Sequence, residues 1–160
     1  MKNLAHHTAS LAITAWVGVL WGIGYIAVPV LFRAQPDKLL AGMLSGQMLV
    51  VTGYVGIVCG TYLLLYRLAL SGKTAAREWM LWLVAAMLAI TLLLQFGVYP
   101  LMADIKLQAH SPDVMQSALA ERFKMWHGIS SVLYLAESLL GAALVVKGAI
   151  GSRPAHQQSR

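Results

Sequence analysis

Residues 123–146 read FKMWHGISSVLYLAESLLGAALVV, and this stretch decides how the rest of the chain is interpreted. It is long enough to cross a bilayer as a helix, which takes about 20 apolar residues. At about 100° per residue, its polar and small residues fall within about a third of the helix circumference. These residues are His127, Ser130, Ser131, Tyr134, Glu137, Ser138 and Gly141. The pattern predicts a membrane helix with one face toward protein and the other toward lipid.

The composition of the whole chain is that of a membrane protein. Of its 160 residues, 59% are hydrophobic and 11% are charged, whereas soluble domains are about 25% charged. The charges lie in short clusters between long apolar segments, each of which meets the length of a bilayer crossing. We predict transmembrane helices over residues 10–32, 40–66, 79–102 and 124–147. A soluble four-helix bundle would show a charged face on each helix, and these segments have none.

The predicted fold class is therefore all-α, an integral membrane four-helix bundle with antiparallel, up-down helices. Residues 1–150 form a single four-helix transmembrane domain, and we expect residues 151–160 to be a polar, disordered tail. The segment GYIAVPVL at 24–31 is echoed by FGVYPLM at 96–102. This echo favours a bundle made of two tandem helix pairs.

The formal net charge of +6 predicts topology rather than nucleic-acid binding, because the basic residues form no patch interleaved with aromatic residues. Basic residues near the cytoplasmic ends of spans set the orientation of a membrane protein. One side of the predicted bundle carries Lys2, Arg67, Lys73, Arg77, Lys147, Arg153 and Arg160. The other side carries Arg33, Lys38, Lys106, Arg122 and Lys124. We predict a multi-pass protein of the cell inner membrane, in contact with lipid, with both termini in the cytoplasm.

Glycines mark two faces where helices approach closely. Gly18 and Gly22 have the small-x-x-x-small spacing in the first helix. The second helix places five glycines on one narrow face: Gly42, Gly46, Gly53, Gly56 and Gly60. Because each glycine costs a helix about 1 kcal/mol, these faces predict close helix packing. The packing partner is another helix of the chain, a lipid or cofactor, or a second copy in a homo-oligomer.

Glu137 is the candidate for chemistry, since an ionised acid in the middle of a bilayer costs several kcal/mol. No Lys or Arg lies at its depth in any predicted helix. We therefore expect an uncharged acid, hydrogen-bonded to Gln95, Tyr25 or Trp21. The expected polar cleft also contains His127, Tyr134 and Ser130. Glu137 would act there as a proton carrier or solute ligand, or would form only an inter-helix hydrogen bond.

The third predicted helix contributes a polar face to the same cleft. Thr91, Gln95, Tyr99 and Met102 share this face. Gln95 lies deep enough that its amide needs a partner.

Any metal or haem site in the predicted bundle would use His127 as a ligand. A bis-histidine haem needs a second histidine at similar depth, but His6 and His7 lie on the other side and His110 lies in a loop. Met125, with His110 and His127, is a weak candidate ligand set for Cu(I), which soft thioethers and imidazole suit. Methionine is also a routine apolar filler. We predict no cofactor, with haem and copper as the alternatives.

Four short motifs carry a family resemblance: Trp16-Val17-Gly18, Pro29-Val30-Leu31-Phe32, Ala41-Gly42 with Gly46, and Phe123-x-x-x-His127-Gly128-Ile129-Ser130. Through these motifs the chain resembles the transmembrane protein 205-like family, small four-helix membrane proteins grouped under a domain of unknown function. The resemblance extends from about residue 9 to residue 147. The architecture is more distantly similar to the copper-resistance protein D family and to four-helix haem-containing protoporphyrinogen oxidases. Those oxidases imply a histidine in the first apolar core, and this chain has none there.

The function expected from the sequence is that of a non-enzymatic inner-membrane protein. Its polar cleft, between the first, third and fourth helices, would receive a small solute, a metal or a partner protein. One alternative is a haem- or copper-binding redox protein that uses His127. The other is a homo-oligomeric membrane scaffold that uses the glycine face of the second helix.

Overall fold

The computed structural model describes residues 2–108, 115 and 118–151. The first span consists of α1 (Lys2–Trp21), the π-helix η1 (Gly22–Ala27) and α2 (Val28–Ala34), and the second span is α3 (Lys38–Ser71). The 3₁₀-helix η2 (Gly72–Arg77) leads to the third span, which consists of α4 (Trp79–Leu93), the π-helix η3 (Leu94–Val98) and α5 (Tyr99–Gln108). The fourth span is α6 (Ala120–Gly151). Over the described residues the chain is helical without strands, so the all-α prediction is confirmed.

Four stretches of the described chain are long and apolar enough to cross a membrane: Ala5–Ala34, Lys38–Ser71, Trp79–Gln108 and Ala120–Gly148. They coincide with the four predicted helices but are longer, because helical hydrogen bonding continues into the polar ends. The carboxylate of Asp37 accepts hydrogen bonds from the backbone N–H groups of Leu39 and Leu40 and so caps α3. Gly151 belongs to α6, while residues 152–160 of the expected tail lie outside the described residues.

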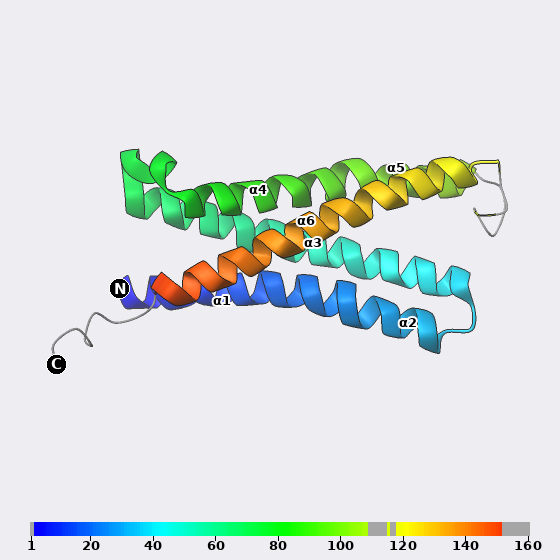
Figure 1. Cartoon of the computed structure of the whole chain (residues 1–160), viewed down its shortest axis with the longest axis horizontal. Coiled ribbons are helices and arrows are strands. Elements are labelled where there is room, and N and C mark those ends of the chain that lie inside the picture. The colour runs from blue at the N-terminus through cyan, green and yellow to red at the C-terminus, as the bar shows by residue number, and fades with distance from the viewer. Residues whose placement is uncertain (1, 109–114, 116–117, 152–160) are drawn as a thin grey trace.

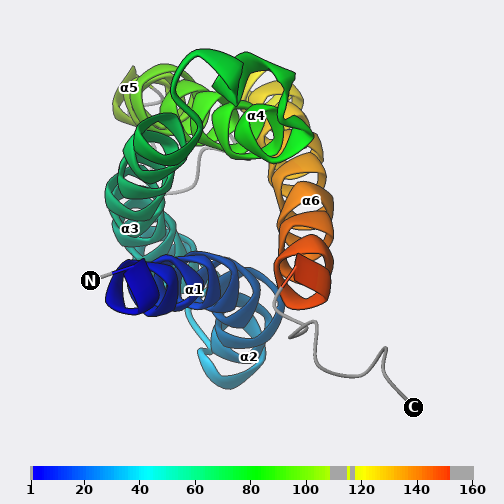
Figure 2. The ribbon, with the colours of Figure 1, turned by 90° about the vertical axis from the view of Figure 1, so that its left-hand side faces the viewer.

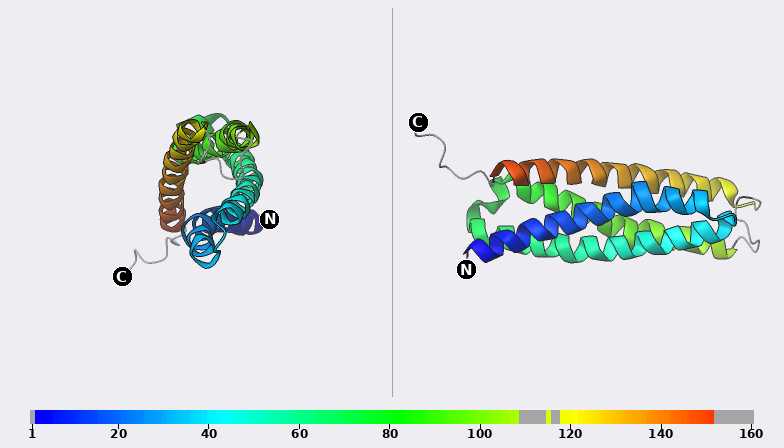
Figure 3. Two further views of the ribbon diagram at one scale, coloured as in Figure 1. Left: turned by 90° about the vertical axis from the view of Figure 1, so that its right-hand side faces the viewer. Right: turned by 90° about the horizontal axis from the view of Figure 1, so that it is seen from below.

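The spans form a closed ring in which each packs against the next and α6 packs against α1. The two end-on views show the order α1, α3, α4, α6 around the bundle (Figures 2 and 3). The start of α1, η2 and the end of α6 lie at one end, called here the terminal end (Figure 1). The connection between α2 and α3 lies at the opposite end, called here the turn end.

Large apolar side chains cover the outside of the ring. Val58 and Val132, for example, are 69% and 67% exposed. Exposed apolar surface on this scale is typical of contact with lipid rather than water. The four apolar helices and this surface indicate a membrane protein.

The terminal half of the bundle contains the apolar core. Its buried residues come from every span: Ala9, Trp16, Val17, Leu63, Val84, Met87 and Leu144. Trp16 is the largest of them and is only 1% exposed. The four spans therefore pack around the indole ring of Trp16 in the terminal half of the bundle.

Two π-helices interrupt the first and third spans, and the sequence had not indicated them. In η1 the wide turn ends where the N–H of Val28 bonds to the carbonyl of Ile23. In η3 it ends where the N–H of Tyr99 bonds to the carbonyl of Leu94. A proline follows each of these closing residues, as Pro29 and as Pro100. Because a proline ring clashes with the carbonyl four residues earlier and donates no hydrogen bond, the wider turn accommodates it.

Candidate functional site

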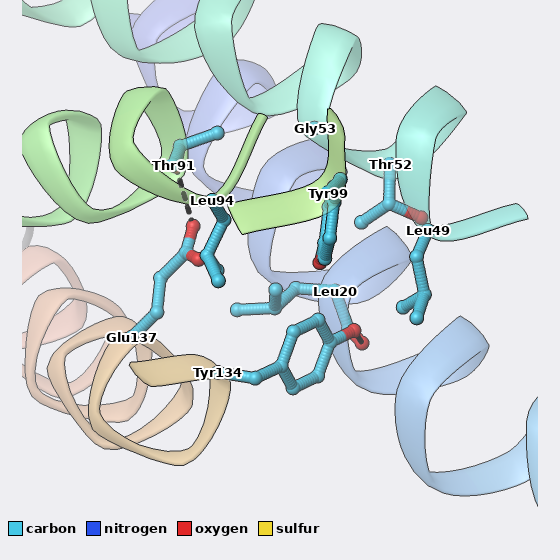
Figure 4. Close-up of a pocket in the computed structure, with 9 residues that line it drawn as sticks. All are labelled: Leu20, Leu49, Thr52, Gly53, Thr91, Leu94, Tyr99, Tyr134 and Glu137. Carbon is cyan, nitrogen blue, oxygen red and sulfur yellow. Dashed lines mark hydrogen bonds between the residues drawn. The ribbon is translucent and has the colours of Figure 1, made fainter. Parts of the chain in front are cut away.

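The centre of the ring contains a small cavity of about 10 Å³. It is lined by Leu20, Leu49, Thr52, Gly53, Thr91, Leu94, Tyr99, Tyr134 and Glu137 (Figure 4). Five of these side chains are polar and are called here the polar cluster: Thr52, Thr91, Tyr99, Tyr134 and Glu137. A cavity needs roughly 10–15 Å³ of this kind to hold a water molecule. The volume of this cavity is thus at the lower limit for a single water molecule.

Glu137 is the most buried member of the polar cluster, with 2% of its surface exposed. The hydroxyl of Thr91 is hydrogen-bonded to its carboxyl, with 2.6 Å between Thr91 Oγ1 and Glu137 Oε1. The indole of Trp16 lies close to the same carboxyl. Among the described residues, the salt bridges join Arg67 to Glu78 and Lys124 to Glu121, and none involves Glu137.

The polar cluster lies deep in the bundle. Glu137 is close to the middle of the apolar stretch Ala120–Gly148, and Thr91 is close to the middle of Trp79–Gln108. A helix rises about 1.5 Å per residue, so both side chains lie within a few ångströms of the centre of their spans. In a bilayer this position is the one farthest from water on either side.

Tyr134 connects the polar cluster to the backbone of the first span. Its hydroxyl donates to the carbonyl of Leu20 at 2.5 Å and lies close against Gly24. In a regular α-helix the Leu20 carbonyl would bond to the Gly24 N–H. The tyrosine hydroxyl therefore lies between two backbone groups that would otherwise pair, where η1 widens the helix. A side chain at position 24 would overlap the Tyr134 ring, so glycine is required there.

Three of the predicted packing glycines on α3 are covered by side chains of the same chain. A Cβ atom at Gly56 would lie 2.6 Å from Trp16 Nε1, and one at Gly60 would lie 2.7 Å from Trp16 Cη2. The amide oxygen of Gln95 lies directly against Gly53. The glycine face of α3 thus holds the indole and the amide that flank the polar cluster.

The remaining packing glycines have more space. A Cβ atom at Gly42 would only touch Phe32, at 4.0 Å, and one at Gly46 would have no described atom within 4 Å. Gly18 and Gly22 are equally open within the described chain. Within the described chain, the close contact of the first span lies at Gly24, and packing at Gly18 and Gly22 stays a prediction.

The prediction of the hydrogen-bond partners of Glu137 was wrong. Trp21 Nε1 donates instead to the backbone carbonyl of Ser138 at 3.3 Å. Tyr25 is 49% exposed, and its ring meets that of Tyr134 edge-on. The oxygen of the Gln95 amide is buried and has no hydrogen-bond partner in the described chain. Because the wide turn of η3 changes the helical register, Gln95 points toward α3 instead of toward α6.

The outer residues of the expected cleft lie apart from the polar cluster. His127 is exposed and stacks on Phe123, with 6.1 Å between the ring centroids. Ser130 is buried but donates to the backbone carbonyl of His127 within its own helix. Met125 is exposed, and His110 lies outside the described residues. In the part of the chain that the structure describes, no three His, Cys, Asp or Glu side chains lie together as a metal-ligand set.

Of the seven predicted cleft residues, Glu137 and Tyr134 line the cavity. The sequence also places Thr91 and Tyr99 on the polar face of the third helix, but of that face only Gln95 is among the predicted cleft residues. Thr52 and Trp16 were missed. Trp16 could have been found from its size, because a large ring on one helix suits the glycine face of its neighbour.

Comparison with known proteins places this architecture in a family. No curated protein and no solved structure matches the chain. One family model, described as "Domain of unknown function (DUF4149)", matches residues 11–111. The match covers most of the first three spans, with Trp16, Gly53 and Thr91, and ends before α6 with Tyr134 and Glu137. Because the match extends over more than half of its length, the chain belongs to the DUF4149 family.

Proposed function

We propose that this protein is a non-enzymatic inner-membrane protein that binds a proton on Glu137 at the centre of its four spans. The proposal includes the transmembrane protein 205-like type suggested by the sequence motifs. It also includes up-down helices with both termini in the cytoplasm. The matching π-helices ahead of Pro29 and Pro100 support an arrangement in two tandem helix pairs.

The observation that carries the proposal is the position of the Thr91 hydroxyl. Its oxygen lies 3.0 Å from the carbonyl oxygen of Met87 and 2.6 Å from Glu137 Oε1. Both are hydrogen-bond distances, but a hydroxyl has only one hydrogen to donate. If Thr91 donates to Met87, a protonated Glu137 supplies the hydrogen for the second contact. The neutral acid therefore satisfies both contacts, and the carboxylate satisfies only one.

The surroundings of Glu137 favour the same protonation state. The titratable side chains beside it are the phenols of Tyr99 and Tyr134, which are neutral groups at physiological pH. A carboxylate at this depth, without a cation, would bear a large desolvation cost. Loss of the proton thus requires water or a cation to enter the polar cluster. Exchange of the proton would then be linked to movement of the helices around it.

Infrared spectroscopy of the protein in lipid nanodiscs tests whether Glu137 is protonated. The carbonyl stretch of a carboxylic acid is separate from the stretches of a carboxylate. We expect a carboxylic acid band at neutral pH that Glu137→Gln abolishes. Glu121→Gln, a change at an exposed acid on the same helix, should leave the band in place. A spectrum that contains only carboxylate bands would refute the proposal.

Proton movement itself can be followed with a pH-sensitive dye trapped in proteoliposomes. We expect an imposed pH gradient to decay faster with the wild-type protein than with Glu137→Gln. The Glu121→Gln variant should behave like the wild type. If all three preparations match protein-free liposomes while the infrared band is present, Glu137 holds its proton for structure and the carrier role is wrong.

A further inference from the structure

A second hollow lies between the first and second spans, in the turn-end half of the bundle. Its volume is about 450 Å³, within the roughly 300–1,000 Å³ of small-molecule sites. One wall comes from the first span, with Val19, Ile23 and Leu31. The facing wall is part of α3, with Leu44, Met48 and Val51. We call this hollow the lateral groove. It extends from the polar cluster, with which it shares Thr52, toward the outside of the ring.

Two polar residues define the ends of the lateral groove. Thr52 is buried at its deep end, where the side chain also lines the cavity beside Glu137. The Thr52 hydroxyl donates to the carbonyl of Met48 at 2.9 Å and so is already satisfied. Gln47 lies nearer the turn end and is exposed. An exposed amide that borders an apolar groove needs a hydrogen-bonding partner from the ligand or the membrane.

The depth of Gln47 follows from the length of its helix. α3 has 34 residues and is therefore about 51 Å long, whereas the hydrocarbon core of a bilayer is about 30 Å thick. Centred on the bilayer, α3 projects about seven residues beyond the core at each end. Gln47 then lies near the boundary where the ester groups of glycerolipids are found. The apolar walls extend from that boundary toward the middle of the membrane.

Basic side chains lie above this boundary at the turn end. Arg33 is exposed in the last turn of α2. Lys38 is exposed at the start of α3 and donates to the carbonyls of Phe32 and Gln35. The neighbouring acid, Asp37, is engaged as the N-cap of α3. With Arg33 and Lys38 against the carboxylate of Asp37, the turn end beside the lateral groove is net positive at the level of lipid head groups.

We propose that the lateral groove binds one anionic glycerophospholipid. An acyl chain lies between the two apolar walls, and the Gln47 amide donates to an ester carbonyl. The phosphate lies beside Arg33 at the rim. This site depends on the membrane location of the protein but not on proton binding by Glu137.

Native mass spectrometry of the detergent-purified protein tests this site with phosphatidylglycerol and phosphatidylcholine that carry the same acyl chains. We expect one tightly retained lipid per chain, with phosphatidylglycerol preferred by about fivefold, since one basic residue near a membrane contributes about that factor. Val51→Trp fills the groove and should remove retention of both lipids. Val58→Trp, a change two turns away on the same exposed face of α3 but outside the lining of the groove, should not.

The head-group contact is tested separately with an exposed residue that is not needed for folding. Arg33→Gln should reduce the preference for phosphatidylglycerol to about onefold, whereas Arg122→Gln, at the same end of the bundle, should preserve it. Equal lipid retention by Val51→Trp and Val58→Trp would overturn the groove assignment. A wild-type dimer that Val51→Trp separates would identify a second copy as the occupant and would also overturn it. Equal retention of the two lipids by the wild type would contradict the predicted preference for an anionic head group.

Discussion

The glycine face of α3 gives the sharpest prediction about stability. Trp16 lies across this face, with its Cη2 and Cζ3 atoms 2.7 and 2.9 Å from the position of a Cβ atom on Gly60. Leu88 Cδ1 is 3.1 Å from the same position. We predict that Gly60→Ala is less stable than an alanine substitution at an open glycine of the same helix, because only at Gly60 does the added methyl group meet packed atoms. Gly46→Ala is the matched control, since no described atom lies within 4 Å of a Cβ atom there.

The magnitude follows from two opposing effects. Replacing a mid-helix glycine by alanine gains about 1 kcal/mol at either position. Forcing a methyl group into a packed core costs about 1–3 kcal/mol, and only Gly60→Ala has this cost. Trp16 is 1% exposed, so the ring cannot move aside into the membrane. The free energies of unfolding of the two variants should therefore differ by about 1–3 kcal/mol.

The free energies can be measured by titrating the purified protein with SDS from a mild detergent. Far-UV circular dichroism reports the helices, and tryptophan fluorescence reports the surroundings of the indole rings. We expect Gly46→Ala to unfold at or above the SDS fraction of the wild type and Gly60→Ala below that of the control. Equal free energies of unfolding for the two variants would refute the packing of Trp16 against Gly60.

Three other predictions test the polar cluster and the absence of a cofactor. Tyr134→Phe removes the hydrogen bond to the Leu20 carbonyl and should lower the free energy of unfolding by about 0.5–1.5 kcal/mol; unchanged amide hydrogen exchange in the first span would contradict it. Gln95→Met removes a buried amide oxygen that has no hydrogen-bond partner in the described chain. The free energy of unfolding should stay equal or rise by about 1 kcal/mol. A lower free energy of unfolding in the SDS titration would show that the amide is needed. The purified protein should show no Soret band and no stoichiometric copper by elemental analysis; either signal would contradict the expectation of no cofactor, and its loss in His127→Ala would then identify His127 as a ligand.

The number and placement of the spans could be predicted from the sequence because they depend on local composition. Each apolar segment is bounded by charges, and a bilayer fixes the length of helix between them. The ends were harder to place, since the cap on α3 depends on the Asp37 side chain rather than on hydropathy. Glu137 was also found from composition alone, as the one acid deep in an apolar segment.

The partners of Glu137 could not be predicted, because they depend on helical register. A wheel drawn at 100° per residue assumes a regular α-helix, but η1 and η3 change the register ahead of Pro29 and Pro100. Thr91 comes before η3 and keeps its predicted direction. Gln95 lies inside η3 and turns toward Gly53. A helical wheel should therefore not be continued across a proline in an apolar segment, because the helix can change register there.

The contact between Tyr134 and the first span has a consequence for biogenesis. The first span leaves the ribosome before α6, so the Leu20 carbonyl is without the Tyr134 hydroxyl until the last span is present. Buried backbone groups in an apolar surrounding must be paired. Pro29 sets the wide turn of η1 from the start, but one of its neighbouring carbonyls receives its side-chain partner from the segment that is synthesised last.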